Sequence, residues 1–170
     1  MAKTAETVDH DRELYARVGL SYLPHIIGLV DRNVLSPTYG CFDRSYWHYK
    51  TAAFPSGMYQ EFVLPLALAY RHSMPGGELF HQQPRLRELV EAGIRHAARS
   101  SHGDGSCDDY FPYERALGAA AFALYACTES YLLLELQAAD MVAFFRKRAD
   151  WLLHREEAGK LSNHHALTAL

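Results

Sequence analysis

The chain has 170 residues, of which 49% are hydrophobic and 22% are charged, and its formal net charge at pH 7 is -3. This length is enough for one domain with a hydrophobic core, and the composition is typical of a globular protein, which excludes a disordered chain. A slightly acidic chain lacks the basic field that nucleic-acid binding requires, so no nucleic-acid partner is expected.

The first predicted element is a helix from Asp11 to about Val34. Its apolar residues recur at helical intervals, as Leu14, Val18, Tyr22, Ile26 and Leu29. Pro24 removes a backbone donor within this helix, so a kink or a division is expected there. The segment from Ser36 to Ser56 follows without a sustained period, and it is rich in aromatic residues. A connection of this length is uncommon unless it is functional or packed by its own side chains.

Two kinds of helix alternate along the rest of the chain. The segments Met58–Arg71 and Glu114–Leu136 are apolar nearly all round, whereas Arg85–Ser100 and Ala138–Glu156 carry one apolar stripe among charged residues. A helix that is apolar on every side must be surrounded, while a striped helix can face water. The pattern therefore predicts inner helices paired with outer helices.

Two local features refine these helices. Pro65 lies within the first inner helix and predicts a kink near Glu61. The basic cluster Arg146-Lys147-Arg148 falls on what we predict to be the polar, solvated side of the last outer helix.

A third inner helix is predicted to begin near Asn163, with Ser162 or Asn163 as its N-cap. The inner helices then begin near Gly57, Glu114 and Asn163, about fifty residues apart, a period typical of helical-hairpin repeats. The predicted fold class is all-α, with helical hairpins of an incomplete (α/α) toroid. Because a closed ring needs more hairpins, residues 1–170 are expected to form the amino-terminal part of a longer toroid.

The segments that precede the inner helices carry the candidate site. We expect them to gather at one end of these helices, where helix N-termini expose free N–H groups. Aromatic rings stack on sugars, and carboxylates and arginine bind hydroxyl groups. The residues predicted to line this saccharide-binding surface are Trp47, Tyr49, Asp108, Asp109, Tyr110, Tyr113 and Arg115. The alternative, that these aromatic residues simply pack the long loops against the helices, stays open.

The triplet Asn163-His164-His165 is the candidate catalytic group. Two imidazoles beside an amide at a helix start could bind an anion and transfer a proton near neutral pH. In the alternative reading, Asn163 caps the helix and one of the histidines is merely exposed.

Two other functions remain open at this stage. Glu61, Asp109 and Glu114 could supply a carboxylate pair for glycoside hydrolysis, although Glu114 would equally suit the first turn of a helix. A helical-repeat module could instead bind a glycan or a protein without catalysis.

No metal and no cofactor are expected. The histidines show neither an HExxH motif nor a Cys/His spacing typical of zinc. The stretch that begins at Asp104 imitates a calcium loop, but it has Asp109 where glycine is needed and Arg115 where glutamate is needed.

The remaining sequence features concern the compartment. Three cysteines, Cys41, Cys107 and Cys127, have no CxxC spacing and favour a reduced compartment or buried thiols. Residues 1–11 do not read as a signal peptide, and no apolar stretch is long enough to span a bilayer. We therefore expect a cytoplasmic protein without a membrane partner.

Three sets of residues resemble a known family. They are Cys41–Lys50 with Phe54–Gly57, then Gly103–Ser106 with Asp109–Arg115, and finally Ser162–His165. Together they resemble the amino-terminal toroid of heparinase II/III-like proteins, a group similar to the alginate lyases, over about residues 36 to 170.

The resemblance implies a lyase that cleaves uronate-containing polysaccharides by β-elimination. Asn163 would neutralise the uronate carboxylate, which acidifies the C5 proton, and His164 or His165 would assist or act as the base. A tyrosine protonates the leaving oxygen in this family. It usually comes from a later inner helix, which residues 1–170 do not contain.

Overall fold

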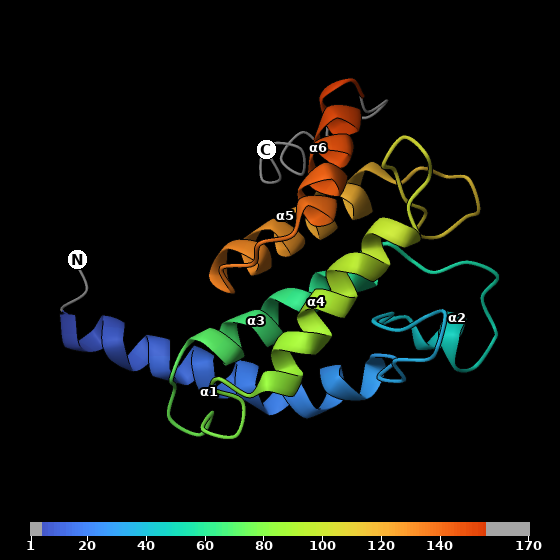
Figure 1. The fold of residues 1–170 in the computed structure, drawn as a ribbon. Coiled ribbons are helices and arrows are strands. Elements are labelled where there is room, and N and C mark those ends of the chain that lie inside the picture. Colours follow the sequence, from blue (N-terminus) through green and yellow to red (C-terminus); the bar gives the residue numbers. More distant parts are fainter. Residues whose placement is uncertain (1–4, 156–170) are drawn as a thin grey trace.

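The computed structural model describes residues 5–155, and within them all regular structure is helical (Figure 1). The all-α prediction is therefore confirmed for this part of the chain. The elements in chain order are α1 (Ala5–Leu29), α2 (Arg44–Trp47), the 3-10 helix η1 (Met58–Phe62), α3 (Val63–Arg71), α4 (Pro84–Arg99), α5 (Leu117–Leu133) and α6 (Ala139–Leu153).

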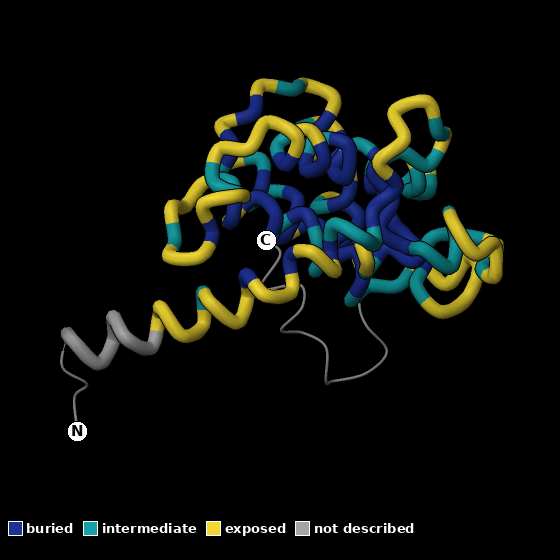
Figure 2. The backbone as a smooth tube through the Cα atoms, turned by 90° about the horizontal axis from the view of Figure 1, so that it is seen from below, coloured by how far each residue is buried: buried dark blue, intermediate teal, exposed yellow. Residues whose placement is uncertain are grey.

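Helix α1 runs through Pro24 as one element, so the predicted division there is not found, and the helix begins and ends earlier than predicted. It ends early because the Asp31 carboxylate accepts hydrogen bonds from the Asn33 N–H at 3.0 Å and the Thr38 hydroxyl at 2.7 Å, which turns the chain. The second half of α1 packs on the body through Leu20, Leu23 and Ile26. The mostly exposed turns just before Leu20 extend away from the body (Figure 2).

The first inner helix is divided into η1 and α3 at the position where a kink was predicted. Pro65 has no N–H to donate to the carbonyl of Glu61, so regular α-helical bonding cannot continue through this turn. Helix α3 buries Val63, Leu66, Ala67 and Ala69.

The second inner helix, α5, packs against η1, α3, α4 and α6. Its buried residues are mostly small, which allows close approach by several neighbours: Ala119, Ala120, Ala121, Ala123, Leu124, Ala126, Cys127 and Ser130. Tyr125 and Leu132 remain exposed on the other side. The prediction that this segment forms a helix surrounded by other helices agrees with these contacts and with its buried residues.

Helix α4 is the striped outer helix that the sequence predicts. It buries an apolar stripe that includes Leu86, Val90 and Ile94. Gly93 lies on this stripe, and a Cβ there would fall 2.5 Å from Cγ1 of Val63, so glycine is what lets α4 approach α3 this closely.

Helix α6 corrects one prediction. Arg146 and Lys147 are exposed, but Arg148 is only 1% exposed and is not part of a solvated face. The physical reason is helical period, since position 148 lies four residues after Phe144 and four before Leu152 and so falls on the buried stripe.

The buried Arg148 is held by the start of the loop that leads into α5. Its Nε donates to the Gly105 carbonyl at 2.9 Å and its Nη2 donates to the Ser101 hydroxyl at 2.8 Å. Its guanidinium also lies over the ring of Phe144, 4.7 Å from the centroid.

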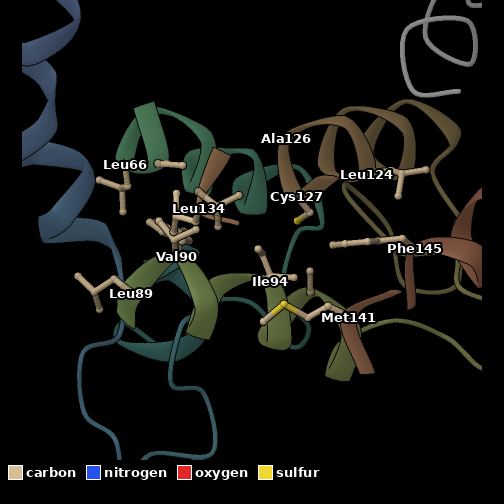
Figure 3. Close-up of a cluster of buried hydrophobic side chains, with 14 of the residues drawn as sticks. Leu66, Leu89, Val90, Ile94, Leu124, Ala126, Cys127, Leu134, Met141 and Phe145 are labelled. Carbon is tan, nitrogen blue, oxygen red and sulfur yellow. The ribbon is translucent and has the colours of Figure 1, made fainter. Parts of the chain in front are cut away.

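The four longer helices after α1 share one core, shown in Figure 3. Its buried side chains come from α3, α4, α5 and α6 and include Leu66, Val90, Ile94, Leu124, Cys127, Met141 and Phe145. This core fixes the inner helices, and thereby the segments that lead into them.

Candidate functional site

The two long segments that precede the inner helices meet at one place, as the sequence predicts. We call residues 31–56 the first rim segment and residues 102–116 the second rim segment. The N–H of Gly57, directly after the first, donates to the carbonyl of Asp108 in the second at 2.7 Å. A Cβ on Gly57 would lie 2.4 Å from Sγ of Cys107, so this close approach depends on glycine.

A buried carboxylate, Asp43, ties the first rim segment together. It accepts hydrogen bonds from the N–H groups of Ser45 and Tyr46, at 3.0 Å and 3.4 Å, and so caps the start of α2. Its second oxygen accepts the N–H of Ser56 at 3.0 Å.

The hydroxyl of Ser56 in turn donates a short hydrogen bond to the carboxylate of Asp109. The chain Asp43–Ser56–Asp109 therefore couples the two rim segments. Sequence reasoning did not single out Asp43 or Ser56, although an aspartate immediately before a short aromatic helix is an N-cap signal.

Two carboxylates shape the second rim segment. Asp108 accepts the N–H groups of Tyr113 at 2.8 Å and Arg115 at 3.0 Å, and it contacts Nε2 of His102 at 2.9 Å. Burial opposes ionisation of Asp108, but these hydrogen bonds outweigh it and hold the pKa of this carboxyl below its ordinary value.

Glu114 is the second of these carboxylates. Its Oε2 accepts the N–H groups of Asp109, Tyr110 and Phe111 at 3.3, 2.8 and 3.2 Å. We predicted that the second inner helix begins at Glu114. This prediction is wrong, because α5 begins at Leu117.

The helix begins later because the residues on either side of Glu114 have left-handed backbones. Tyr113 has a φ of 62° and Arg115 a φ of 53°. Both are non-glycine residues in a conformation that a right-handed helix excludes, and the Asp108 carboxylate binds the N–H of each.

This loop presents its aromatic side chains to solvent. Tyr110 is 79% exposed and Tyr113 is 82% exposed, and the ring of Tyr113 stacks on His102 with centroids 6.0 Å apart. Phe111, which sequence reasoning did not select, is exposed beside them. Arg115 forms an ion pair with Asp104.

Trp47 and Tyr49 belong to a separate group near the end of α1. The Trp47 indole N–H donates to the carbonyl of Leu29 at 2.8 Å, so its polar atom is already used. The Arg44 guanidinium lies 5.7 Å from the Trp47 ring and 5.1 Å from the Tyr49 ring. Within residues 5–155, no ring contact or hydrogen bond joins this pair to Tyr110 or Tyr113.

Glu61 on η1 is the rim carboxyl with the most unusual environment. It is half-buried, and burial raises its pKa above the ordinary value of a glutamate, while the negative charge of Asp109 raises it further. Such a carboxyl can stay protonated at a higher pH than an ordinary glutamate and can donate a proton.

The thiols near the site are unsuited to nucleophilic chemistry. Burial raises the pKa of Cys41 and Cys127 to about 12, and it raises the pKa of Cys107 as well. Within residues 5–155, no group of three or more His, Cys, Asp or Glu side chains is placed to hold a metal ion. In the same range, no helix combines the length and the apolar character needed to cross a membrane.

The predicted catalytic triplet Asn163, His164 and His165 lies outside the described residues. Comparison of the chain with protein-family models, with curated proteins and with solved structures found no match in any of the three.

Proposed function

We propose that this chain contributes the substrate rim of a polysaccharide lyase that cleaves uronate-containing glycans by β-elimination. The observation that carries the proposal is the junction of the two rim segments at the start of η1 and α5, which leaves Tyr110 and Tyr113 exposed. Rigidly mounted, exposed aromatic rings are the usual platform for sugar rings.

The architecture proposed is an (α/α) toroid. Helix α3 packs against α4 and α5, and α5 packs against α6, which is the contact order expected of successive hairpins. In this arrangement the helix predicted to begin at Asn163 would be the next inner helix, and its start would lie near the rim.

Each residue of such a site would have a separate role, whether it lies among the described residues or, as residues 163–165 do, outside them. Tyr110 and Tyr113 would stack on saccharide rings, and Arg115 could exchange its Asp104 partner for a uronate carboxylate. Trp47 offers a ring face but no donor, because Leu29 holds its N–H. Asn163 with His164 or His165 would neutralise the uronate and remove the C5 proton.

The test is incubation of the chain with a polyuronate and, as control, a neutral glucan. β-Elimination leaves an unsaturated sugar, so ultraviolet absorbance should rise with the polyuronate alone. The rise should be slow, because water has to protonate the leaving oxygen in place of the tyrosine that the family takes from a later helix. The variant Asn163→Ala should lose this signal while keeping glycan binding in affinity electrophoresis. Binding of both polymers with equal strength, and no effect of Asn163→Ala, would contradict the proposal and favour a non-catalytic module.

Glycoside hydrolysis is the second candidate, and the raised pKa of Glu61 beside Asp109 favours it. In that mechanism Glu61 would be the general acid and Asp109 the second carboxyl group of the pair. Glu114 is a poor member of this pair because three backbone N–H groups already bind its carboxylate oxygen. New reducing ends without unsaturated product, abolished by Glu61→Gln but not by Asn163→Ala, would support hydrolysis.

A further inference from the structure

A groove of about 550 Å³ lies apart from the junction of the two rim segments, and its lining includes none of Asp43, Asp108, Asp109 or Glu114. It runs between the end of α1, the first part of the first rim segment and the start of α4. Its lining includes the apolar side chains of Ile27, Phe80 and Leu86 and the ring of Tyr39. Polar side chains also line the groove, from the first rim segment (Arg32 and Asn33) and from the start of α4 (Gln83 and Arg85).

The charged residues that line this groove are Arg32, Arg85 and Glu88. Arg32 lines it and is exposed, and no ion pair joins Arg32 to another residue in the part of the chain described. Arg85 also lines it, but the carboxylate of Glu88 lies 2.6 Å from its guanidinium. The neighbouring Asp31 is buried, and its oxygens are bound by Asn33 and Thr38.

The groove therefore offers an unpaired guanidinium in a chain whose net charge is -3. The side-chain amides of Asn33 and Gln83 add further donors. Donors along the edges and rings within the lining suit a chain of acidic sugars, since sugar faces pack on rings while carboxylate or sulfate groups bind guanidinium.

The groove and the rim share one supporting loop. The first rim segment forms a groove wall at Arg32 and Tyr39, and a few residues later it reaches Asp43, which holds Ser56 and through it Asp109. Resting on the function proposed above, we propose that this groove is a second subsite for the acidic polysaccharide, with Arg32 binding a carboxylate or sulfate of the polymer.

The experiment measures binding of the 170-residue chain to a long polyuronate by affinity electrophoresis at low and high salt. Removing one charge-assisted hydrogen bond in Arg32→Ala should weaken binding about fivefold and reduce its salt dependence. The control Arg146→Ala removes an exposed arginine from α6, and it should leave the affinity unchanged. Glu88→Gln should strengthen binding, because it frees Arg85 and removes a negative charge.

The outcomes separate the two proposals. If the unaltered chain binds no polyuronate, the proposed function fails. If it binds polyuronate and Arg32→Ala equals Arg146→Ala, the groove proposal alone is overturned. If poly-glutamate binds as tightly as polyuronate and with the same dependence on Arg32, the groove recognises acidic peptides, and the saccharide assignment is wrong.

Discussion

The first rim segment is built into the helical core, whereas the exposed part of the second, residues 109–115, is held mainly by side chains of the same loop. In the first, Phe42 and Cys41 are fully buried. In the second, the carboxylates of Asp108 and Glu114 bind the loop's own backbone, and Tyr113 stays exposed. We infer that the first segment fixes the position of the rim and that the second presents side chains to a ligand.

The largest expected effect comes from the residue that anchors the first segment. Gln60 is buried, and it accepts the N–H of Phe42 at 3.1 Å and donates to the carbonyls of Gly40 and Gly93 at 3.2 and 2.8 Å. Gln60→Ala leaves the buried N–H of Phe42 and the carbonyl of Gly40 without this partner, and it should lower the free energy of unfolding by about 3–5 kcal/mol in denaturant titration.

Its matched control is Gln137→Ala, at an exposed glutamine. This variant should change the free energy of unfolding by less than about 0.5 kcal/mol. Equal effects at the two positions would mean that the first segment is not anchored through Gln60.

The second effect is a pH dependence of stability that comes from a buried histidine on α4. His96 on α4 is buried with both ring nitrogens unpartnered, and its pKa is lowered from 6.5 to about 4. Burial is the main cause and the positive charge of Arg99 adds to it, while the negative charge of Asp31 opposes them. The unfolded chain therefore binds the proton more tightly than the folded protein. Stability should be full above pH 6.5 and should fall by about 3 kcal/mol as the pH drops to about 4.

Thermal unfolding across this pH range checks the prediction. His96→Gln should flatten the pH dependence, whereas His25→Gln, at an exposed position on α1, should retain it. If His96→Gln leaves the pH dependence of stability unchanged, groups other than His96 cause it.

The third prediction concerns the junction of the two segments. Gly57 has an ordinary helical φ of -66°, so Gly57→Ala introduces no backbone strain but places a Cβ against Cys107. It should destabilise the protein by about 1–3 kcal/mol. Gly103→Ala meets no atom within 4 Å and is the control. Cys107→Ala in the Gly57→Ala background should recover part of the lost stability. If the stability changes of the two single variants simply add in the double variant, the steric explanation is wrong.

The smallest effect on stability is expected in the second segment. Glu114→Ala exposes three N–H groups to solvent and should cost about 1 kcal/mol. Limited proteolysis should nevertheless cut the loop faster, since the Glu114 carboxylate no longer binds the loop's backbone N–H groups.

Tyr113→Ala should lower the free energy of unfolding by less than about 0.5 kcal/mol while weakening glycan binding. A large loss of stability in Tyr113→Ala would show that this ring packs the loop and does not serve a ligand.

Much of the helical framework could be predicted from the sequence. The apolar and striped helices, the division near Pro65 and the meeting of the two rim segments all follow from local periods and from the need to surround an apolar helix. The predicted residues Asp109, Tyr110, Tyr113 and Arg115 do lie on one loop, because they are neighbours in the chain.

Contacts between distant positions could not be read in this way. The sequence alone determined which stretches are helical and which of them must be buried, since both properties are written in local spacing. The tertiary structure decided that Arg148 faces inward, that Asp43 reaches Asp109 through Ser56, and that Glu114 closes a loop and does not begin a helix. Each depends on a partner brought near by packing, and hydrogen bonds of this kind leave no period in a sequence.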